Sequence, residues 1–253
     1  MSKRVPSDAE GRPQRKAIYL LPNLFTTAAL FAGFFAIVSA IRDDFVAAAI
    51  AVFVAMVLDG LDGRVARLTH TQSAFGVEYD SLADIVSFGV APALVIFLWA
   101  LEAIDGRWGA LGAFVYLLSA AIRLARFNVQ VETADKRFFT GLASPAAAAM
   151  LMGMVWVLES RAIDPAPWVG WIWVLTVTTG LLMVSSFPYY SFKAVSPRLK
   201  LSFFSIPLAV VLFVLAMRDL ALTLWLLFLA YGLSAPLWVL WRRTVRLVVR
   251  PGG

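Results

Sequence analysis

DGLDGRVARLTHTQSAFGVEYDSLAD, the stretch from Asp59 to Asp84, holds four aspartates between two apolar runs of membrane-spanning length. A carboxylate at such a depth in a membrane costs free energy, and where one occurs it usually serves function. Asp59, Asp62, Asp80 and Asp84 are therefore the first candidates for a functional site.

The spacing of these acids predicts that they converge. Asp59 and Asp62 are three residues apart, and Asp80 and Asp84 are four apart, so each pair lies on one face of a helix. If the two helices meet, like charges share one small volume and cannot all stay ionised without compensation. A hard divalent cation with oxygen ligands is the usual compensation, so the sequence predicts a Mg²⁺ or Mn²⁺ site.

Two small residues and an arginine follow the first pair of acids. Gly63 and Ala66 leave room beside that pair, and Arg67 lies one turn beyond Gly63. A guanidinium at this position suits a substrate phosphate that also touches the metal. The pattern therefore indicates phosphate chemistry.

The composition is that of a membrane protein. Hydrophobic residues make up 61% of the 253 residues and charged residues 15%, and the mean hydropathy is +0.81. Soluble domains are about half apolar and about a quarter charged. The chain has no cysteine and one histidine, His70, which excludes disulfides, thiolate metal sites and multi-histidine centres.

The apolar runs predict an all-α bundle of about eight membrane-spanning helices. Several runs are short and depend on their flanks for length, since a span needs about 20 residues. The expected spans are 17–41, 45–58, 85–101, 108–124, 142–158, 168–187, 203–217 and 220–241.

The basic residues predict how these spans are oriented. If the N-terminus is cytoplasmic, the 22 Lys and Arg residues fall on cytoplasmic segments except Arg42, Arg107, Arg161 and Arg218. Cytoplasmic loops carry such an excess, so both termini and the acidic motif are expected at the cytoplasmic face. The net charge of +6 is spread over helix ends and forms no single patch, so we expect no nucleic-acid partner.

These boundaries predict three parts of the chain. We expect a basic cytoplasmic tail at 1–16, a transmembrane domain at 17–241 with its signature at 59–84, and a second basic cytoplasmic tail at 242–253.

The acidic stretch resembles, without a gap, the signature of the CDP-alcohol phosphotransferase family. That signature is Asp, two residues, Asp-Gly, two residues, Ala-Arg, eight residues, Gly, three residues, Asp, three residues, Asp. The matching positions are Asp59, Asp62, Gly63, Ala66, Arg67, Gly76, Asp80 and Asp84. Eight specified positions at fixed spacing make this a specific match.

The resemblance implies a reaction and a role for each acid. A CDP-linked lipid binds with its diphosphate on two divalent ions, Mg²⁺ or Mn²⁺, an alcohol attacks the β-phosphorus, and CMP leaves. By match to the motif, Asp59, Asp62 and Asp80 are metal ligands. Asp84 is implied as the general base for the attacking hydroxyl and as a further metal ligand.

Other positions are implied as contacts of the CDP-linked lipid. Gly63 and Arg67 match the contacts to the nucleotide diphosphate, while Ala66 and Gly76 are structural positions of the motif. Ser73 occupies a position that contacts substrate in relatives of the family; the alternative is an ordinary loop hydroxyl. 

The start of the first span also resembles the family. Asn23, after Pro22, and Thr26 a turn later match the segment that approaches the CDP group. The alternative is that both residues only break or cap a helix near the interface.

Three further stretches resemble the phosphatidylserine synthase branch of the family: SLADIVSFGVAPA at 81–93, AAIRLARFNV at 120–129 and FFTGLASPAAA at 138–148. The branch commonly has proline where this chain has Ala143. The resemblance implies CDP-diacylglycerol and L-serine as substrates. Arg123 and Arg126 are candidate partners of the serine carboxylate, although both can be anchors at a cytoplasmic helix end.

Alternatives to serine transfer remain. Inositol phosphate or glycerol 3-phosphate can be the acceptor in the same chemistry. A cation-coupled transporter also carries intramembrane acids, and an intramembrane aspartyl protease carries a Tyr-Asp pair such as Tyr79-Asp80. The chain shows no second, related half and no Gly-x-Gly-Asp motif, so both rivals are disfavoured.

The interpretation is an enzyme of phospholipid biosynthesis in the cytoplasmic membrane. We expect its active site at the cytoplasmic face and contacts with membrane phospholipid. By resemblance to relatives, we expect a homodimer.

Overall fold

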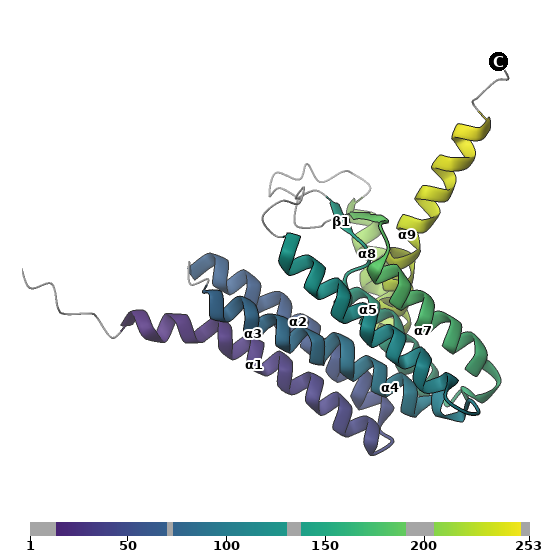
Figure 1. Cartoon of the computed structure of the whole chain (residues 1–253), viewed down its shortest axis with the longest axis horizontal. Coiled ribbons are helices and arrows are strands. Elements are labelled where there is room, and N and C mark those ends of the chain that lie inside the picture. The colour runs from purple at the N-terminus through teal and green to yellow at the C-terminus, as the bar shows by residue number, and fades with distance from the viewer. Residues whose placement is uncertain (1–13, 70–72, 131–137, 191–204, 249–253) are drawn as a thin grey trace, which may run out of the picture.

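Long apolar helices form nearly all of the described structure. The computed structural model describes residues 14–69, 73–130, 138–190 and 205–248 (Figure 1). The elements in chain order are α1 Gln14–Ile41, α2 Phe45–Thr69, α3 Ala74–Asp84, η1 Ile85–Val90, α4 Ala91–Trp99, η2 Leu101–Ala103, α5 Trp108–Gln130, β1 Phe138–Thr140, α6 Ser144–Glu159, η3 Ala166–Trp168, α7 Val169–Val184, β2 Pro188–Tyr190, α8 Ser205–Arg218 and α9 Leu220–Val248.

Six helices of the described ranges are long and apolar enough to cross a membrane. They are Pro22–Ile41, Phe45–Thr69, Ala74–Trp99, Trp108–Val129, Ala166–Val184 and Leu220–Arg242. α6 is apolar but shorter, with 16 residues, and α8 has 14. The predicted polytopic helical membrane protein is confirmed, with α6 and α8 as the short members.

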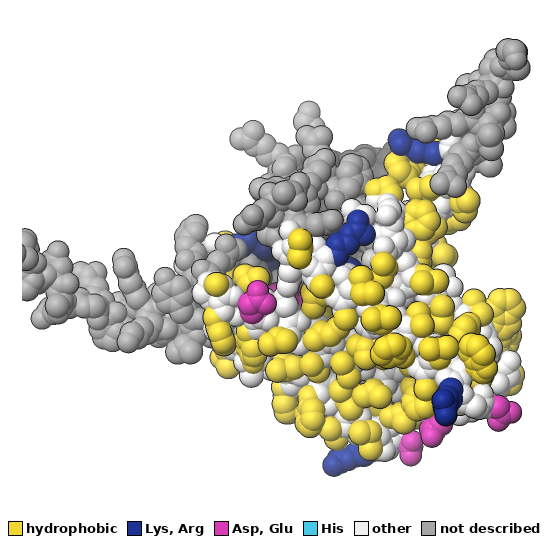
Figure 2. Space-filling view, viewed as in Figure 1, with side chains coloured by type: hydrophobic (Ala, Val, Ile, Leu, Met, Phe, Trp, Pro, Cys, Tyr) yellow, Lys and Arg dark blue, Asp and Glu magenta, His cyan; other side chains and the backbone are white. Residues whose placement is uncertain are grey.

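The outer surface is suited to contact with lipid. In Figure 2 the visible face carries a broad band of hydrophobic side chains, with charged side chains at its two ends. Large residues such as Phe31 and Phe34 are 64% and 56% exposed. On a soluble protein such a band would be an aggregation hazard, whereas lipid tails cover it at no cost.

Small side chains let the helices approach closely inside the bundle. The alanines at 146–149 of α6 are all buried, as are Ala48, Ala49, Ala51 and Ala55 of α2. Packing between helices in a membrane depends on van der Waals contact, which short side chains permit at close backbone separation. α6, buried along nearly its whole length, therefore becomes the central helix.

A short strand pair joins the connections after α5 and α7. β1 and β2 are antiparallel, with Phe138 opposite Tyr190, Phe139 opposite Tyr189 and Thr140 opposite Pro188. Gly141 follows β1 with φ of 84°, a left-handed conformation that favours glycine, and its N–H donates to Phe187 O at 2.9 Å. The sequence analysis did not predict this pair, because three-residue strands leave no periodicity to detect.

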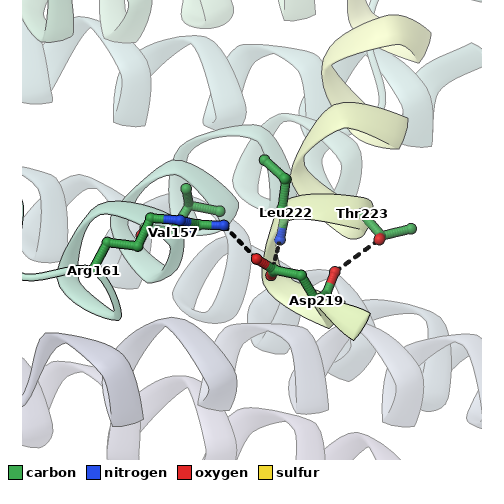
Figure 3. Close-up of polar contacts among 5 residues, drawn as sticks. All are labelled: Val157, Arg161, Asp219, Leu222 and Thr223. Carbon is green, nitrogen blue, oxygen red and sulfur yellow. Dashed lines mark hydrogen bonds and ion pairs between the residues drawn. The ribbon is translucent and has the colours of Figure 1, made fainter. Parts of the chain in front are cut away.

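An ion pair holds the start of α9. Arg161, after α6, pairs with Asp219, and its other Nη donates to Val157 O at 3.0 Å (Figure 3). Asp219 Oδ1 also accepts from Leu222 N at 2.9 Å, and its carbonyl accepts from Thr223 Oγ1 at 2.7 Å. Asp219 therefore caps α9 and fixes it to the end of α6.

α1 lies directly against the helix that follows the second acid pair. Ser87, in the π-helical turn η1, donates from Oγ to Ala29 O at 3.1 Å. A Cβ built on Gly33 would lie 2.6 Å from Ser87 Oγ and 2.8 Å from Ser87 Cα. The absence of a side chain at Gly33 thus permits this approach.

Replacing Gly33 by alanine is expected to lower the thermal unfolding midpoint of the purified protein in detergent. The Ser87 backbone would have to move, and overpacking of this kind costs about 1–3 kcal/mol. Gly170→Ala is the matched control, because no described atom lies within 4 Å of a Cβ there. Both variants gain helix propensity, so an equal midpoint for the two would contradict the close packing of α1 on η1.

Candidate active site

Three carboxylates meet where α2 and α3 come together. The ligand oxygens of Asp59, Asp62 and Asp80 lie within 4.8 Å of one another. Asp62 is buried, with 5% exposure, and the other two are half-buried. The three-residue spacing on α2 turns both of its acids towards α3, as expected for one helix face.

Asp84 joins this group from the next turn of α3. Its carboxyl interacts electrostatically with Asp59 and Asp80 and lies within hydrogen-bonding reach of Asp59. The π-helical turn η1 begins directly after it. Such turns change the direction of the following side chains and occur often at functional sites. The structure therefore brings all four acids of the motif together.

The donor set suits a hard divalent cation. Carboxylate oxygens are the ligands that Mg²⁺ and Mn²⁺ prefer, and three from different side chains are close enough to share one ion. Like-charged carboxylates at this separation repel one another unless a cation or a proton lies between them. The four-acid cluster, Asp59, Asp62, Asp80 and Asp84, can therefore hold divalent metal.

Thr26 of α1 orients one of these acids. Its buried hydroxyl donates to Asp62 Oδ2 at 2.8 Å and is 3.2 Å from Pro22 O. A hydrogen bond to a ligating carboxylate fixes the direction of its free oxygen. In the described structure Thr26 thus contacts Asp62, a role that the sequence analysis did not consider.

The glycine and arginine of the motif lie together at the end of α2. A Cβ built on Gly63 would be 3.7 Å from Arg67 Nη1, so the guanidinium lies over this glycine. Arg67 also interacts electrostatically with Asp62. Ala66, which lies between Gly63 and Arg67 in the sequence, is partly buried. The arrangement offers a cation beside the acids, with space that a larger side chain at position 63 would fill.

Ser73 begins α3. It is the N-cap, and its Oγ accepts from Gly76 N at 3.0 Å. Asn23 Oδ1 of α1 lies near the same glycine, 3.5 Å from a Cβ built there. Ser73 is exposed, so a hydroxyl that caps the helix also remains accessible to a ligand.

Arg123 of α5 faces the four-acid cluster. Its guanidinium interacts electrostatically with Asp84 and Asp59, and its Nη1 donates to Ser144 Oγ at 2.5 Å. The side chain of Arg126, one turn later, is partly buried, and within the described part of the chain it makes no hydrogen bond or ion pair with the acids. The sequence predicted the same role for Arg123 and Arg126, and in the structure Arg123 is the one that faces the acids.

The sequence analysis did not identify the other polar groups near Arg123. Ser144 lies inside the stretch 138–148, so its branch resemblance was a usable signal. Tyr116, two turns before Arg123 on α5, is fully buried and donates its hydroxyl to Phe88 O at 2.9 Å.

α3 and α5 are joined beside this region. Asn128 Nδ2 donates to Ser81 Oγ at 3.0 Å, and Ser81 in turn donates to Val77 O at 3.0 Å. Because Ser81 lies between Asp80 and Asp84 in sequence, this bond fixes the helix that carries the second acid pair.

Tyr189 of β2 stays protonated. Its side chain is fully buried, and burial, with the neighbouring Tyr231, raises the pKa of Tyr189 to about 12. Its hydroxyl donates to Gly232 O at 2.8 Å. At neutral pH Tyr189 therefore acts as a permanent donor that attaches β2 to α9.

Fold and site together define an integral membrane protein with an acidic, metal-competent site at one end of a helical bundle. Residues 19–184 match the family model for CDP-alcohol phosphatidyltransferase. The chain therefore belongs to the CDP-alcohol phosphatidyltransferase family, and the predicted family resemblance is confirmed.

Curated relatives are similar over most of their length. A protein from Helicobacter pylori is 40% identical over 221 residues, which cover 85% of this chain and 90% of the relative. One from Mycobacterium tuberculosis is 34% identical over 239 residues, with 89% and 81% covered. One from Methanocaldococcus jannaschii is 31% identical over 182 residues, with 72% and 80% covered. Each of these relatives is named CDP-diacylglycerol–serine O-phosphatidyltransferase.

Replacing Thr26 by valine is expected to weaken Mn²⁺ binding by about tenfold or more, because Asp62 loses the donor that orients it. The measurement is titration of purified protein with Mn²⁺, followed by loss of the free-ion electron paramagnetic resonance signal. Thr27→Val is the matched control, since Thr27 contacts Asn23 O and Tyr79 instead. Equal Mn²⁺ affinity in both variants would show that Thr26 does not contribute to metal binding.

Proposed function

We propose that this protein transfers the phosphatidyl group of CDP-diacylglycerol to the hydroxyl of L-serine, giving phosphatidylserine and CMP. The observation that carries the proposal is the four-acid cluster with Arg123 beside it, in a chain of this family. The names of the curated relatives support serine as the acceptor.

The acids divide into ligands and a base. Asp59, Asp62 and Asp80 would hold two divalent ions, Mg²⁺ or Mn²⁺, with Asp84 as a further ligand of the second. When bound, this metal supplies positive charge that neutralises the diphosphate. Thr26 supports the arrangement by holding Asp62.

Asp84 is proposed as the general base. Its carboxylate takes the proton of the serine hydroxyl while the serine oxygen forms a bond to the β-phosphorus. The bond from that phosphorus to the bridging oxygen breaks, and CMP leaves with the oxygen. Because Asp84 interacts with both Asp59 and Asp80, its protonation is a property of the cluster and not of one residue.

The CDP-linked lipid is proposed to lie between α1, α2 and α3. Gly63 permits close approach of the diphosphate, and Arg67 offers it a guanidinium. Asn23 and Ser73 are proposed polar contacts at the start of α1 and α3. Gly76 and Ala66 have structural roles in this arrangement.

The acceptor is proposed to bind between the acids and α5. Serine carries a carboxylate, which a partly buried guanidinium recognises by charge and by paired hydrogen bonds. Arg123 is the proposed contact, because it faces the four-acid cluster. Arg126 is retained as a second candidate. Inositol phosphate and glycerol 3-phosphate are anionic as well, so they are the acceptors to compare with serine.

The placement in the cell is also proposed. The basic residues support a cytoplasmic membrane protein with both termini and the active site at the cytoplasmic face, where Lys and Arg contact lipid headgroups. The tails at 1–16 and 242–253 would flank one catalytic domain at 17–241. A homodimer is proposed from resemblance to the family.

CMP release from CDP-diacylglycerol with Mn²⁺ or Mg²⁺ is expected with serine and not with inositol phosphate or glycerol 3-phosphate. Asp84→Asn is expected to slow release by about 10²–10⁴-fold, because the hydroxyl loses its base. Glu78→Gln is the matched control, an exposed acid on the same helix. Release with another acceptor alone would refute serine transfer, and full activity of Asp84→Asn would refute the base.

Replacing Arg123 by glutamine is expected to raise KM for serine by about tenfold or more, since a hydrogen-bonded charge pair is lost. KM for CDP-diacylglycerol is expected to change little. The steady-state rates of CMP release provide both constants. Arg126→Gln is measured in parallel, and a larger rise of serine KM in that variant would move the carboxylate contact to Arg126.

A further inference from the structure

The π-helical turn η1 follows the second acid pair directly, because it begins at Ile85, the residue after Asp84. Its extra residue is visible in the backbone hydrogen bonds, where Ala91 N donates to Val86 O, five residues earlier. Side chains before such a turn point in a different direction from those of an unbroken α-helix. The direction of Asp84 relative to α4 therefore depends on this turn.

The hydroxyl of Tyr116 on α5 is attached to the same turn. It donates to Phe88 O at 2.9 Å, and both residues are buried. In an α-helix the carbonyl of residue 88 would accept from the N–H of residue 92, but Pro92 has none. Tyr116 thus supplies a hydrogen bond that the backbone at Pro92 cannot supply, one turn after Asp84.

A glycine lets η1 and α5 approach closely enough for this bond. A Cβ built on Gly89 would lie 3.2 Å from Leu117 Cδ1 and 3.5 Å from Ala120 Cβ, both on α5. Small residues allow this separation between helices in a membrane. The contact between η1 and α5 is therefore made by packing as well as by the tyrosine hydroxyl.

A second hydrogen bond joins the same two helices on the other side of Asp84. Asn128 Nδ2 donates to Ser81 Oγ at 3.0 Å. Ser81 precedes Asp84 by three residues, whereas the carbonyl that Tyr116 binds follows it by four. On α5 the two donors lie on either side of Arg123 in the sequence. The helices thus run antiparallel here, with one hydrogen bond before and one after the level of Asp84 and Arg123.

We propose that Tyr116 is a positioning residue for Asp84, which acts by fixing the π-helical turn η1 against α5. Without this attachment the turn would be free to return to α-helical hydrogen bonding, and the helix before it would rotate. Asp84 would then turn away from the other three acids of the cluster. Phenylalanine at position 116 would keep the ring in place and remove only the hydrogen bond to Phe88 O.

The inference deepens the proposed function and rests on it in one respect, which is that Asp84 is a ligand of the divalent metal. It does not depend on which alcohol is the acceptor. Mn²⁺ binding requires neither the lipid nor the acceptor, so it reports the position of Asp84 separately from the reaction.

The test is a double-mutant cycle on Mn²⁺ affinity, measured with the purified full chain in detergent by loss of the free-ion electron paramagnetic resonance signal. Tyr116→Phe is expected to weaken Mn²⁺ binding about tenfold, because residues that orient the ligands of a metal contribute to its affinity. In the Asp84→Asn background the same change is expected to have an effect within about twofold, because the carboxylate that it positions is already absent.

Tyr189→Phe is the matched control, since Tyr189 is also a fully buried tyrosine that donates to a backbone carbonyl, Gly232 O, at 2.8 Å. It is expected to lower the thermal midpoint as Tyr116→Phe does and to leave Mn²⁺ affinity within about twofold. The proposal is overturned if Tyr116→Phe leaves Mn²⁺ affinity unchanged, if Tyr189→Phe weakens it equally, or if the effects of Tyr116→Phe and Asp84→Asn multiply.

The two levels of the hypothesis fail in different ways. CMP release with an acceptor other than serine alone would refute serine transfer and leave the result for Tyr116 unaffected. Absence of Mn²⁺ binding by the wild-type protein would overturn the metal site and the role of Tyr116 together.

Discussion

Repulsion among four carboxylates inside an apolar bundle is the constraint that the surrounding structure must satisfy. Unit charges about 5 Å apart repel by about 3 kcal/mol per pair at an effective dielectric constant of about 20. Three of the acids have ligand oxygens within 4.8 Å of one another. Charge of opposite sign is supplied by Arg67 and Arg123, a hydrogen bond by Thr26, and the remaining deficit is what a divalent cation would fill.

The packing of small residues makes this concentration of acids geometrically feasible. Gly33 lets α1 lie directly against Ser87, and the alanines of α2 and α6 bring those helices close. Because side-chain direction follows backbone placement, such tight contacts also determine where Thr26 meets Asp62. The chain thus uses close helix packing, which a membrane environment requires in any case, to set the positions of its polar groups.

Different helices supply the acids and the arginine of the candidate site. The motif on α2 and α3 holds all four acids, while Arg123 and the serine that accepts from it, Ser144, come from α5 and α6. If Arg123 binds the acceptor as proposed, the residues of the metal motif can stay the same among relatives while the residues that contact the acceptor differ.

The sequence alone predicted the membrane-spanning helices and the grouping of the acids, because hydropathy and helical periodicity can be read from short stretches of the chain. It was not enough for the strand pair of β1 and β2, or for the distinction between Arg123 and Arg126. It gave no sign of the bond from Thr26 to Asp62. These features join residues distant in the chain, and their proximity arises only when whole helices pack, through contacts such as Gly232 on Met150.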